Sequence, residues 1–200
     1  SALDAVEQTG LAETLAWALL EQRREEGGGE QALAVARELV QAAGGSTELR
    51  DQTVALYREL YGDREHFDAI ERASGLSLGQ AARGAIRTLD VCLAIDAGTF
   101  LAARFDPRVL QVEAFDEVMG EYVCRDRQGR ETRLEPKTLA ADFEPVQPDD
   151  FRVLLAHRPG DLDELVRSDP ETLLVGVCLA RGGTVDSDEL RDLLEQDVLE

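Results

Sequence analysis

Few residues of this 200-residue sequence have the type and spacing that catalysis or metal binding requires. The two histidines, His66 and His157, lie far apart, and neither has a cysteine or carboxylate at a spacing typical of a metal site. Cys124 lies on a predicted strand beside Arg125 and Arg127, which could lower the pKa of its thiol. Alternation between core and surface positions explains Cys124 better. We therefore expect no metal, no cofactor and no enzyme activity.

Three further motifs are only superficially like functional sites. The segment 182–188 is rich in Gly and Asp but lacks the glycine and the terminal glutamate of an EF-hand calcium loop. The glycines at 27–29 lack the Lys-Ser/Thr of a phosphate loop. The acid pair Asp149-Asp150 has no identifiable base or nucleophile as a partner, so we interpret it as a helix cap.

The middle of the chain has a distinctive group of arginines. Residues 100–133 contain six arginines against seven acidic residues, whereas the rest of the chain contains 15 basic and 34 acidic residues. Next to an exposed Phe105, such arginines could contact an acidic protein surface or phosphates. The candidate binding residues are Arg104, Phe105, Arg125, Arg127 and Arg130. Alternatively, these arginines pair with Asp106, Asp126 and Glu131 on neighbouring strands.

The overall composition narrows the function further. The formal net charge of −20 argues against nucleic acid or an anionic membrane as the main partner, so we expect a protein partner. No apolar stretch is long enough for a transmembrane helix, and no signal peptide is recognisable. Cys92, Cys124 and Cys178 are typical of reduced core residues in a cytoplasmic protein. Lys137 is the only lysine, which indicates either a host with high internal salt or a genome that favours arginine codons.

Apolar residues at helical spacing predict a helical module over residues 1–95. Short connections that contain glycine indicate antiparallel neighbours, as in a bundle or a helical repeat. The expected helices span 11–26, a second segment that ends at Gly44-Gly45, a third that is capped by Ser46 and ends at Gly62, 64–73, and 77–89.

From residue 96 the pattern changes to short β-prone segments separated by turn signals. The expected strands are 100–102, 109–115, 122–124 and 132–134. Strands this short do not form a large sandwich, so residues 96–146 predict a small SH3- or Tudor-like β-barrel. Residues 144–148 are interpreted as the linker that leaves the barrel.

Residues 147–200 again have a helical pattern. A helix capped by Asp149 or Asp150 is expected to end at Pro159-Gly160, and Asp161 is expected to cap the next one. Asp169-Pro170 predicts another helix start. A last helix, capped at 186 or 187, is still in progress at Glu200, so we expect a fragment of a longer protein. The predicted fold class is α+β.

A family resemblance covers about half of the chain. The segments that carry it are the helix 89–95, the turn 97–100, the strands 109–115 and 121–125, the linker 143–151, and the helix starts at 159–162 and 169–174. Together they resemble the long N-terminal extension of some large Gre-type transcription elongation factors. The small barrel of that extension is similar to the polymerase-interacting modules of CarD-like proteins. The coiled-coil tip with which Gre factors assist transcript cleavage is not recognisable in this sequence.

The resemblance implies a non-catalytic accessory region of a transcription elongation factor that docks on RNA polymerase through the barrel. Two other functions stay open at this point. The helical module could be a scaffold whose barrel binds an unrelated protein. The arginines of the barrel could instead contact nucleic acid directly, with an affinity that falls steeply as salt rises.

Overall fold

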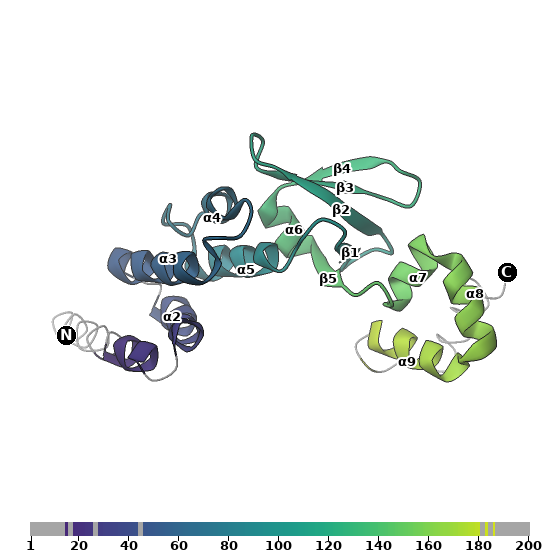
Figure 1. Ribbon diagram of the computed structural model, residues 1–200, viewed down its shortest axis with the longest axis horizontal. Helices are drawn as coiled ribbons and strands as arrows, with labels where there is room; N and C mark the ends of the chain where they lie inside the picture. Colours follow the sequence, from purple (N-terminus) through teal and green to yellow (C-terminus); the bar gives the residue numbers. More distant parts are fainter. Residues whose placement is uncertain are drawn as a thin grey trace. The chain divides into compact units, whose positions relative to one another are not determined.

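A computed structural model describes residues 15, 18–25, 28–43, 46–180, 183 and 186 of the chain. The chain divides into two compact units, Ser1–Leu93 and Ala94–Glu200, and each is described by itself. Unit 1 is helical, whereas unit 2 combines a β-sheet with helices (Figure 1). The predicted α+β fold class is therefore confirmed.

Unit 1 is built from helices joined by short turns. Residues 18–25 are helical, and the later helices are α2 (Gly29–Ala43), α3 (Thr47–Tyr61), α4 (Phe67–Ser74) and α5 (Ala82–Leu93). Helix α3 starts where the sequence predicts, because the Ser46 side chain accepts a hydrogen bond from the Leu49 amide at 3.3 Å. The core of the unit includes buried apolar side chains of α2, α3 and α5, among them Leu33, Tyr57 and Leu89.

Two helices of unit 1 start later than the sequence predicts. Helix α4 starts at Phe67 instead of residue 64, because residues 62–66 form a turn that ends with His66 in a left-handed conformation. Helix α5 starts at Ala82 instead of residue 77. Gly75 and Gly79 both have positive φ angles, so the chain between α4 and α5 turns before a new helix can begin.

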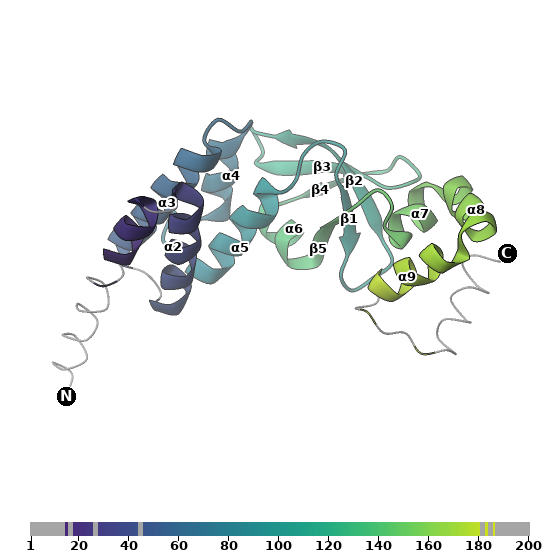
Figure 2. The ribbon, with the colours of Figure 1, turned by 60° about the horizontal axis from the view of Figure 1, so that its bottom comes forward.

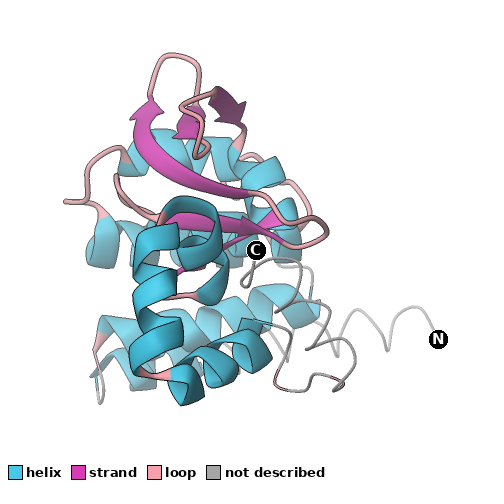
Figure 3. Cartoon of the chain, turned by 90° about the vertical axis from the view of Figure 1, so that its right-hand side faces the viewer, coloured by secondary structure: helices cyan, strands magenta, loops and turns pink. Residues whose placement is uncertain are grey.

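Unit 2 contains a five-stranded antiparallel sheet with the strand order β4-β3-β2-β1-β5 (Figures 1 and 3). The strands are β1 (Phe100–Ala103), β2 (Val109–Asp116), β3 (Glu121–Arg125), β4 (Glu131–Leu134) and β5 (Phe143–Val146). The pairing of β2 with β3 shifts register between Val112 and Ala114, which marks a β-bulge. The four strands predicted from the sequence are all present.

The fifth strand corrects the interpretation of residues 144–148 as an exit linker. Strand β5 pairs with β1, and Pro145 lies opposite Leu101. A proline is tolerated there because β5 is an outer strand of the sheet and its outward side needs no amide donor. A short helix that was not predicted, α6 (Pro136–Asp142), connects β4 to β5 and buries Leu139.

The sheet is followed, up to residue 180, by the helices α7 (Phe151–His157), α8 (Pro159–Ser168) and α9 (Pro170–Ala180). Helix α7 lies against β1 and β2 (Figure 2). Its Val153 packs in a core with Phe100 and Val109, and His157 Nε2 lies 3.0 Å from the Val109 carbonyl oxygen. A second core, formed by Phe151, Leu154, Leu162, Leu173 and Val177, joins the three helices to one another. Residues 151–180 therefore pack in one unit with the sheet.

Two predicted helix boundaries in this region are confirmed, and one is wrong. Helix α7 ends at His157, directly before Pro159-Gly160, as the sequence predicts. The next helix, α8, begins at Pro159 and not after Asp161, since proline suits the first turn of a helix. Asp161 consequently lies in the first turn of α8 and not at its cap. Asp169 does cap α9, because its carboxylate accepts from the Thr172 amide at 3.1 Å. The predicted last helix, apart from residue 186, and most of the segment 182–188 lie outside the described residues.

Candidate functional site

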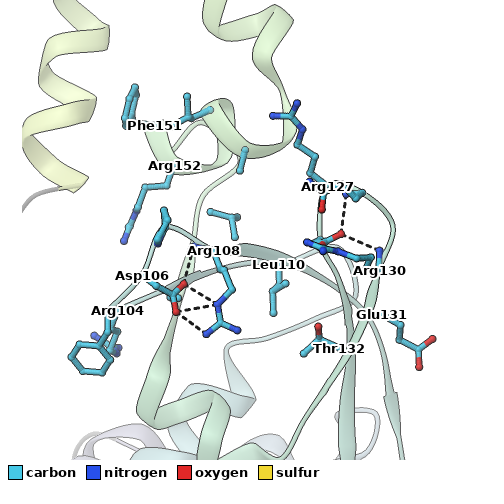
Figure 4. A pocket seen from close by; sticks show the side chains of 18 residues that line it. Arg104, Asp106, Arg108, Leu110, Arg127, Arg130, Glu131, Thr132, Phe151 and Arg152 are labelled. Atoms are coloured by element: carbon cyan, nitrogen blue, oxygen red, sulfur yellow. Dashed lines mark hydrogen bonds and ion pairs between the residues drawn. The ribbon is translucent and has the colours of Figure 1, made fainter. Parts of the chain in front are cut away.

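Unit 2 contains a pocket with a volume of about 1230 Å³ (Figure 4). Its walls come from the loop between β1 and β2, the turn between β3 and β4, and one side of α7. The lining residues are 103–110, 126–128, 130–132, 151, 152, 155 and 156. These segments are far apart in sequence and are brought together by the sheet and by the packing of α7 on it.

The β1–β2 loop contributes a fixed ion pair and an exposed aromatic ring. Asp106 accepts from Arg108 twice, with Oδ1–Nε at 2.9 Å and Oδ2–Nη2 at 2.7 Å (Figure 4). The hydrogen bond from Arg108 is the main reason that the pKa of Asp106 lies below its ordinary value. Phe105, next to this pair, is 84% exposed.

The β3–β4 turn is held by one carboxylate. Asp126 Oδ1 accepts from the amides of Gln128 and Arg130 at 2.9 and 3.0 Å, and its Oδ2 accepts from Arg130 Nε at 2.7 Å. Arg127 lies within this turn and is exposed. Its guanidinium has no carboxylate partner in the described part of the chain, and it is the one pocket-lining arginine for which this is true.

A third group of charges lies where β5 and α7 approach each other. Glu144 of β5 accepts from Arg152 at 2.7 Å with Oε1 and from Arg104 at 3.1 Å with Oε2. Asp150 accepts from Arg152 as well, with Oδ2–Nη2 at 3.0 Å. The hydrogen bonds that Arg152 donates, to Asp150 first and then to Glu144, raise the pKa of Arg152 above its ordinary value. Arg104 and Arg152 are therefore both positioned by Glu144, which lies on β5, the strand that was not predicted from the sequence.

The structure places four of the five predicted binding residues around the pocket: Arg104, Phe105, Arg127 and Arg130. Arg125 is not among the lining residues. Its Nε donates to Glu113 Oε1 at 2.5 Å and its Nη1 donates to the Gly129 carbonyl at 2.9 Å. Arg108 and Arg152 were not among the predicted binding residues. Arg108 could have been found from the sequence, because Arg104 and Arg108 lie on either side of an Asp-Pro turn signal.

The alternative interpretation was that these arginines pair with Asp106, Asp126 and Glu131 on neighbouring strands. All three acids do pair with arginines, but only the pair of Glu131 crosses strands, and the other two lie within a loop and a turn. Arg108 pairs with Asp106 and Arg130 with Asp126, both at 2.7 Å. Arg125 approaches Glu131 across strands β3 and β4 at 3.7 Å. The arginines therefore both pair with acids and cluster around the pocket. The charge of most of them is compensated by a nearby carboxylate, and these ion pairs lie around the pocket.

The charge of the pocket differs from that of the chain as a whole. Five arginines line the pocket, against the carboxylates of Asp106, Asp126 and Glu131. The lining thus carries more positive than negative charge in a chain with a net charge of −20. In a chain this acidic, such a lining repels an acidic group of another molecule less than the net charge of the chain would suggest.

Cys124 and the two histidines are the side chains that the sequence singled out for possible catalysis or metal binding. Cys124 is buried, and burial, followed by the charge of Glu113, raises the pKa of its thiol to about 12. The thiol is consequently protonated at neutral pH, and the neighbouring arginines do not activate it. His66 lies in unit 1 and His157 in unit 2. No group of three or more potential metal ligands occurs within the described residues.

Comparisons of the sequence with protein-family models and with curated proteins, and of the structure with solved structures, gave no match. No helix within the described ranges is both long enough and apolar enough to cross a membrane. The geometry of the pocket is therefore the basis on which a function can be argued.

Proposed function

We propose that this chain is a non-catalytic protein-binding region of a transcription elongation factor and that it docks on RNA polymerase through the pocket of unit 2. The observation that carries the docking proposal is an arginine-rich pocket with an exposed aromatic ring in an otherwise acidic chain. The choice of RNA polymerase rests on the resemblance of residues 89–194 to the extension of Gre-type factors.

The composition and size of the pocket support a protein partner. Aromatic residues and arginine are enriched in protein interfaces, and Phe105 lies among five arginines here. The volume of about 1230 Å³ exceeds the range of about 300–1000 Å³ that is usual for small-molecule sites. A rigid sheet and a packed helix position the walls, so little conformational entropy is lost when a partner binds.

The charge arrangement supports a protein over a nucleic acid. Binding to a phosphate backbone depends on several cations that replace its counterions. Among the pocket arginines, four already have carboxylate partners, and three carboxylates line the same surface. These carboxylates would repel a chain of phosphates, whereas a protein segment can place a single negative charge next to one arginine and avoid the carboxylates.

The proposal includes a cytoplasmic location. Cys92, Cys124 and Cys178 are all free. Free cysteines suit a reducing compartment, in which disulfides do not persist.

The proposal is tested by a pull-down of purified core RNA polymerase from the same host with the full 200-residue chain, over a series of salt concentrations. We expect the wild-type chain to retain polymerase and the double variant Phe105→Ser/Arg127→Glu to lose it. The control is Arg83→Glu, because Arg83 is an exposed arginine of α5 in unit 1 and is not part of the pocket.

Circular dichroism and cooperative unfolding verify that each variant is folded. A folded wild-type chain that retains no polymerase would overturn the polymerase proposal. Retention that is equal in the wild type and the double variant would overturn the role of the pocket.

A further inference from the structure

We propose that the pocket recognises a short acidic segment of its protein partner, in which one carboxylate binds Arg127 and adjacent apolar side chains cover Phe105. This inference rests on the proposed docking function and specifies the chemistry of the ligand. It is carried by two features in one pocket: an exposed arginine that has no carboxylate partner among the described residues, and an exposed aromatic ring.

The turn of Arg127 holds an exposed guanidinium in a position where it can bind an anion. The turn that carries it is fixed by the two backbone hydrogen bonds to Asp126, at 2.9 Å from Gln128 and 3.0 Å from Arg130. The carboxylate of Asp126 forms its ion pair with Arg130 and not with Arg127, and Arg127 is exposed to solvent. An incoming carboxylate can accept two parallel hydrogen bonds from such a guanidinium, which is the strongest form of this contact.

The other pocket arginines limit the ligand to few charges. Arg108 is paired with Asp106, and Arg104 and Arg152 share Glu144. Their positive charges are therefore compensated before any ligand arrives. One uncompensated cation matches one isolated carboxylate and does not match a run of phosphates or a polyacidic tract, which would be repelled by the carboxylates already present.

The apolar requirement comes from Phe105. Among the large apolar side chains that are exposed in the described part of unit 2, Phe105 is the one that lines the pocket; Val118, Met119, Leu174 and Val175 do not. Pro107 of the same loop and Leu155 of α7 add further apolar surface to the lining. A ligand that covers this surface removes an exposed ring from water, which stabilises the complex.

The distribution of these groups indicates a peptide segment rather than a small acid. Arg104, next to Phe105 in the chain, and Arg127 lie on opposite sides of the pocket (Figure 4). A ligand that contacts both the loop of Phe105 and the turn of Arg127 has to span the pocket. An extended peptide advances about 3.3 Å per residue and presents alternate side chains to the two sides, so a few residues suffice.

The test begins with a display selection, in which the immobilised full chain selects from a pool of random peptides of about 12 residues, a length sufficient for extended-segment recognition. We expect the selected peptides to contain Asp or Glu next to aliphatic or aromatic residues. The same selection on Arg127→Gln is expected to lose the acidic position and to keep the apolar ones. A selected set without an acidic position, or no selected set at all, would overturn the inference.

The second step is a double-mutant cycle with one selected peptide and its Glu→Gln or Asp→Asn analogue, measured by fluorescence titration. We expect the neutral analogue to bind the wild-type chain about 10-fold more weakly, as expected for a hydrogen bond to a charged group. The two peptides are expected to bind Arg127→Gln equally. Phe105→Ser should weaken both peptides. The matched controls Arg83→Gln and Val118→Ser, which alter an exposed arginine and an exposed apolar residue outside the pocket, should change neither.

The outcomes separate this inference from the proposed function. A peptide that binds with the expected coupling, together with a chain that retains no polymerase, keeps the inference and overturns the polymerase partner. If the chain retains polymerase, the peptide does not displace it and Arg127→Gln does not weaken its retention, then the polymerase partner stands and the inference is overturned. Displacement of the peptide by a single-stranded oligonucleotide, with no effect of the carboxylate on affinity, would assign the pocket to nucleic acid.

Discussion

The two units of this protein use arginine in different ways. In unit 1, Arg37 of α2 donates to the Tyr57 hydroxyl of α3 at 2.8 Å and to Asp90 of α5 at 2.5 Å, and the Tyr57 hydroxyl donates to Asp90 at 2.6 Å. This network lies between helices and is partly buried. In unit 2 four of the arginines that line a pocket form ion pairs, and a fifth, Arg127, is left without a carboxylate partner in the described residues.

The comparison shows that the number of arginines does not define a binding site. Arg37 has its hydrogen-bonding capacity directed inward, where it satisfies two polar groups that helix packing removes from water. Arg127 has the same side chain as Arg37, but the turn that carries it is stabilised by the carboxylate of Asp126 and not by Arg127 itself. What distinguishes a candidate binding arginine is that its local structure does not need it.

The largest expected effect contrasts two aromatic residues. Tyr57 is fully buried, with 0% exposure, whereas Phe105 is 84% exposed. Tyr57→Ala should lower the free energy of unfolding of unit 1 by about 3–5 kcal/mol, because it leaves a cavity and removes two hydrogen bonds. Phe105→Ala should change stability by less than about 0.5 kcal/mol. Urea unfolding followed by circular dichroism measures both, and equal losses of stability would contradict the contrast.

The second prediction contrasts the two arginines directly. Arg37→Gln leaves Asp90 half-buried without its cationic partner, so stability should fall by about 1–3 kcal/mol. Arg127→Gln should leave stability within about 0.5 kcal/mol of the wild type. The double variant Arg37→Gln/Asp90→Asn should recover part of the loss, because the unpaired charge is removed. A larger loss of stability in Arg127→Gln than in Arg37→Gln would refute the assignment of structural and binding roles.

The third prediction concerns pH, for which the two units should respond in opposite directions. Hydrogen bonds from Arg133 to Asp116 and from Arg108 to Asp106 lower the pKa of each carboxyl below its ordinary value. The stability that these groups contribute to unit 2 is present above the pKa of the unfolded chain and is lost as pH falls through the lowered, folded-state pKa. Burial instead raises the pKa of Asp90, so its contribution to unit 1 decreases as pH rises through that raised value.

Unfolding free energies measured as a function of pH test these signs. Asp116→Asn should flatten the acid branch, and Asp90→Asn should flatten the branch in which stability declines with rising pH. If Asp116→Asn left the acid branch unchanged, the ion pair with Arg133 would not contribute as the structure indicates.

The smallest expected effect concerns Cys124. Because burial raises the pKa of its thiol to about 12, Cys124 should resist alkylation by iodoacetamide in the folded chain at neutral pH. Mass spectrometry of tryptic peptides measures the extent of labelling, with the urea-unfolded chain as the reference for full reaction. Rapid labelling of Cys124 in the folded chain would mean that the adjacent arginines activate the thiol after all.

The sequence predicted best the features that depend on local chemistry. The start of α3 at Ser46 and the start of α9 at Asp169-Pro170 follow from side chains that cap nearby amides, and both were predicted correctly. At Pro159 the predicted end of the preceding helix is correct, but the start of α8 was predicted too late, at Asp161, although proline favours the first turn of a helix.

Features that depend on distant pairing were missed. Strand β5 contains Pro145 and is recognisable only through its pairing with β1, about 40 residues earlier in the chain, a separation that no local pattern encodes. The contact of Arg104 and Arg152 with Glu144 requires β1, β5 and α7 to lie together, so it could not be predicted either. Arg104, Phe105, Arg127 and Arg130 line one pocket, and the turn signals of the sequence place them in two loops at the ends of paired strands. Their role in binding stays a prediction.

Hydrogen exchange of the full chain, with and without core RNA polymerase, shows whether the pocket of unit 2 is the docking surface. We expect slower exchange on binding in the segments 104–110 and 126–130, with little change around Arg37 in unit 1. Slower exchange confined to unit 1, or to parts of unit 2 outside these two segments, would contradict this expectation.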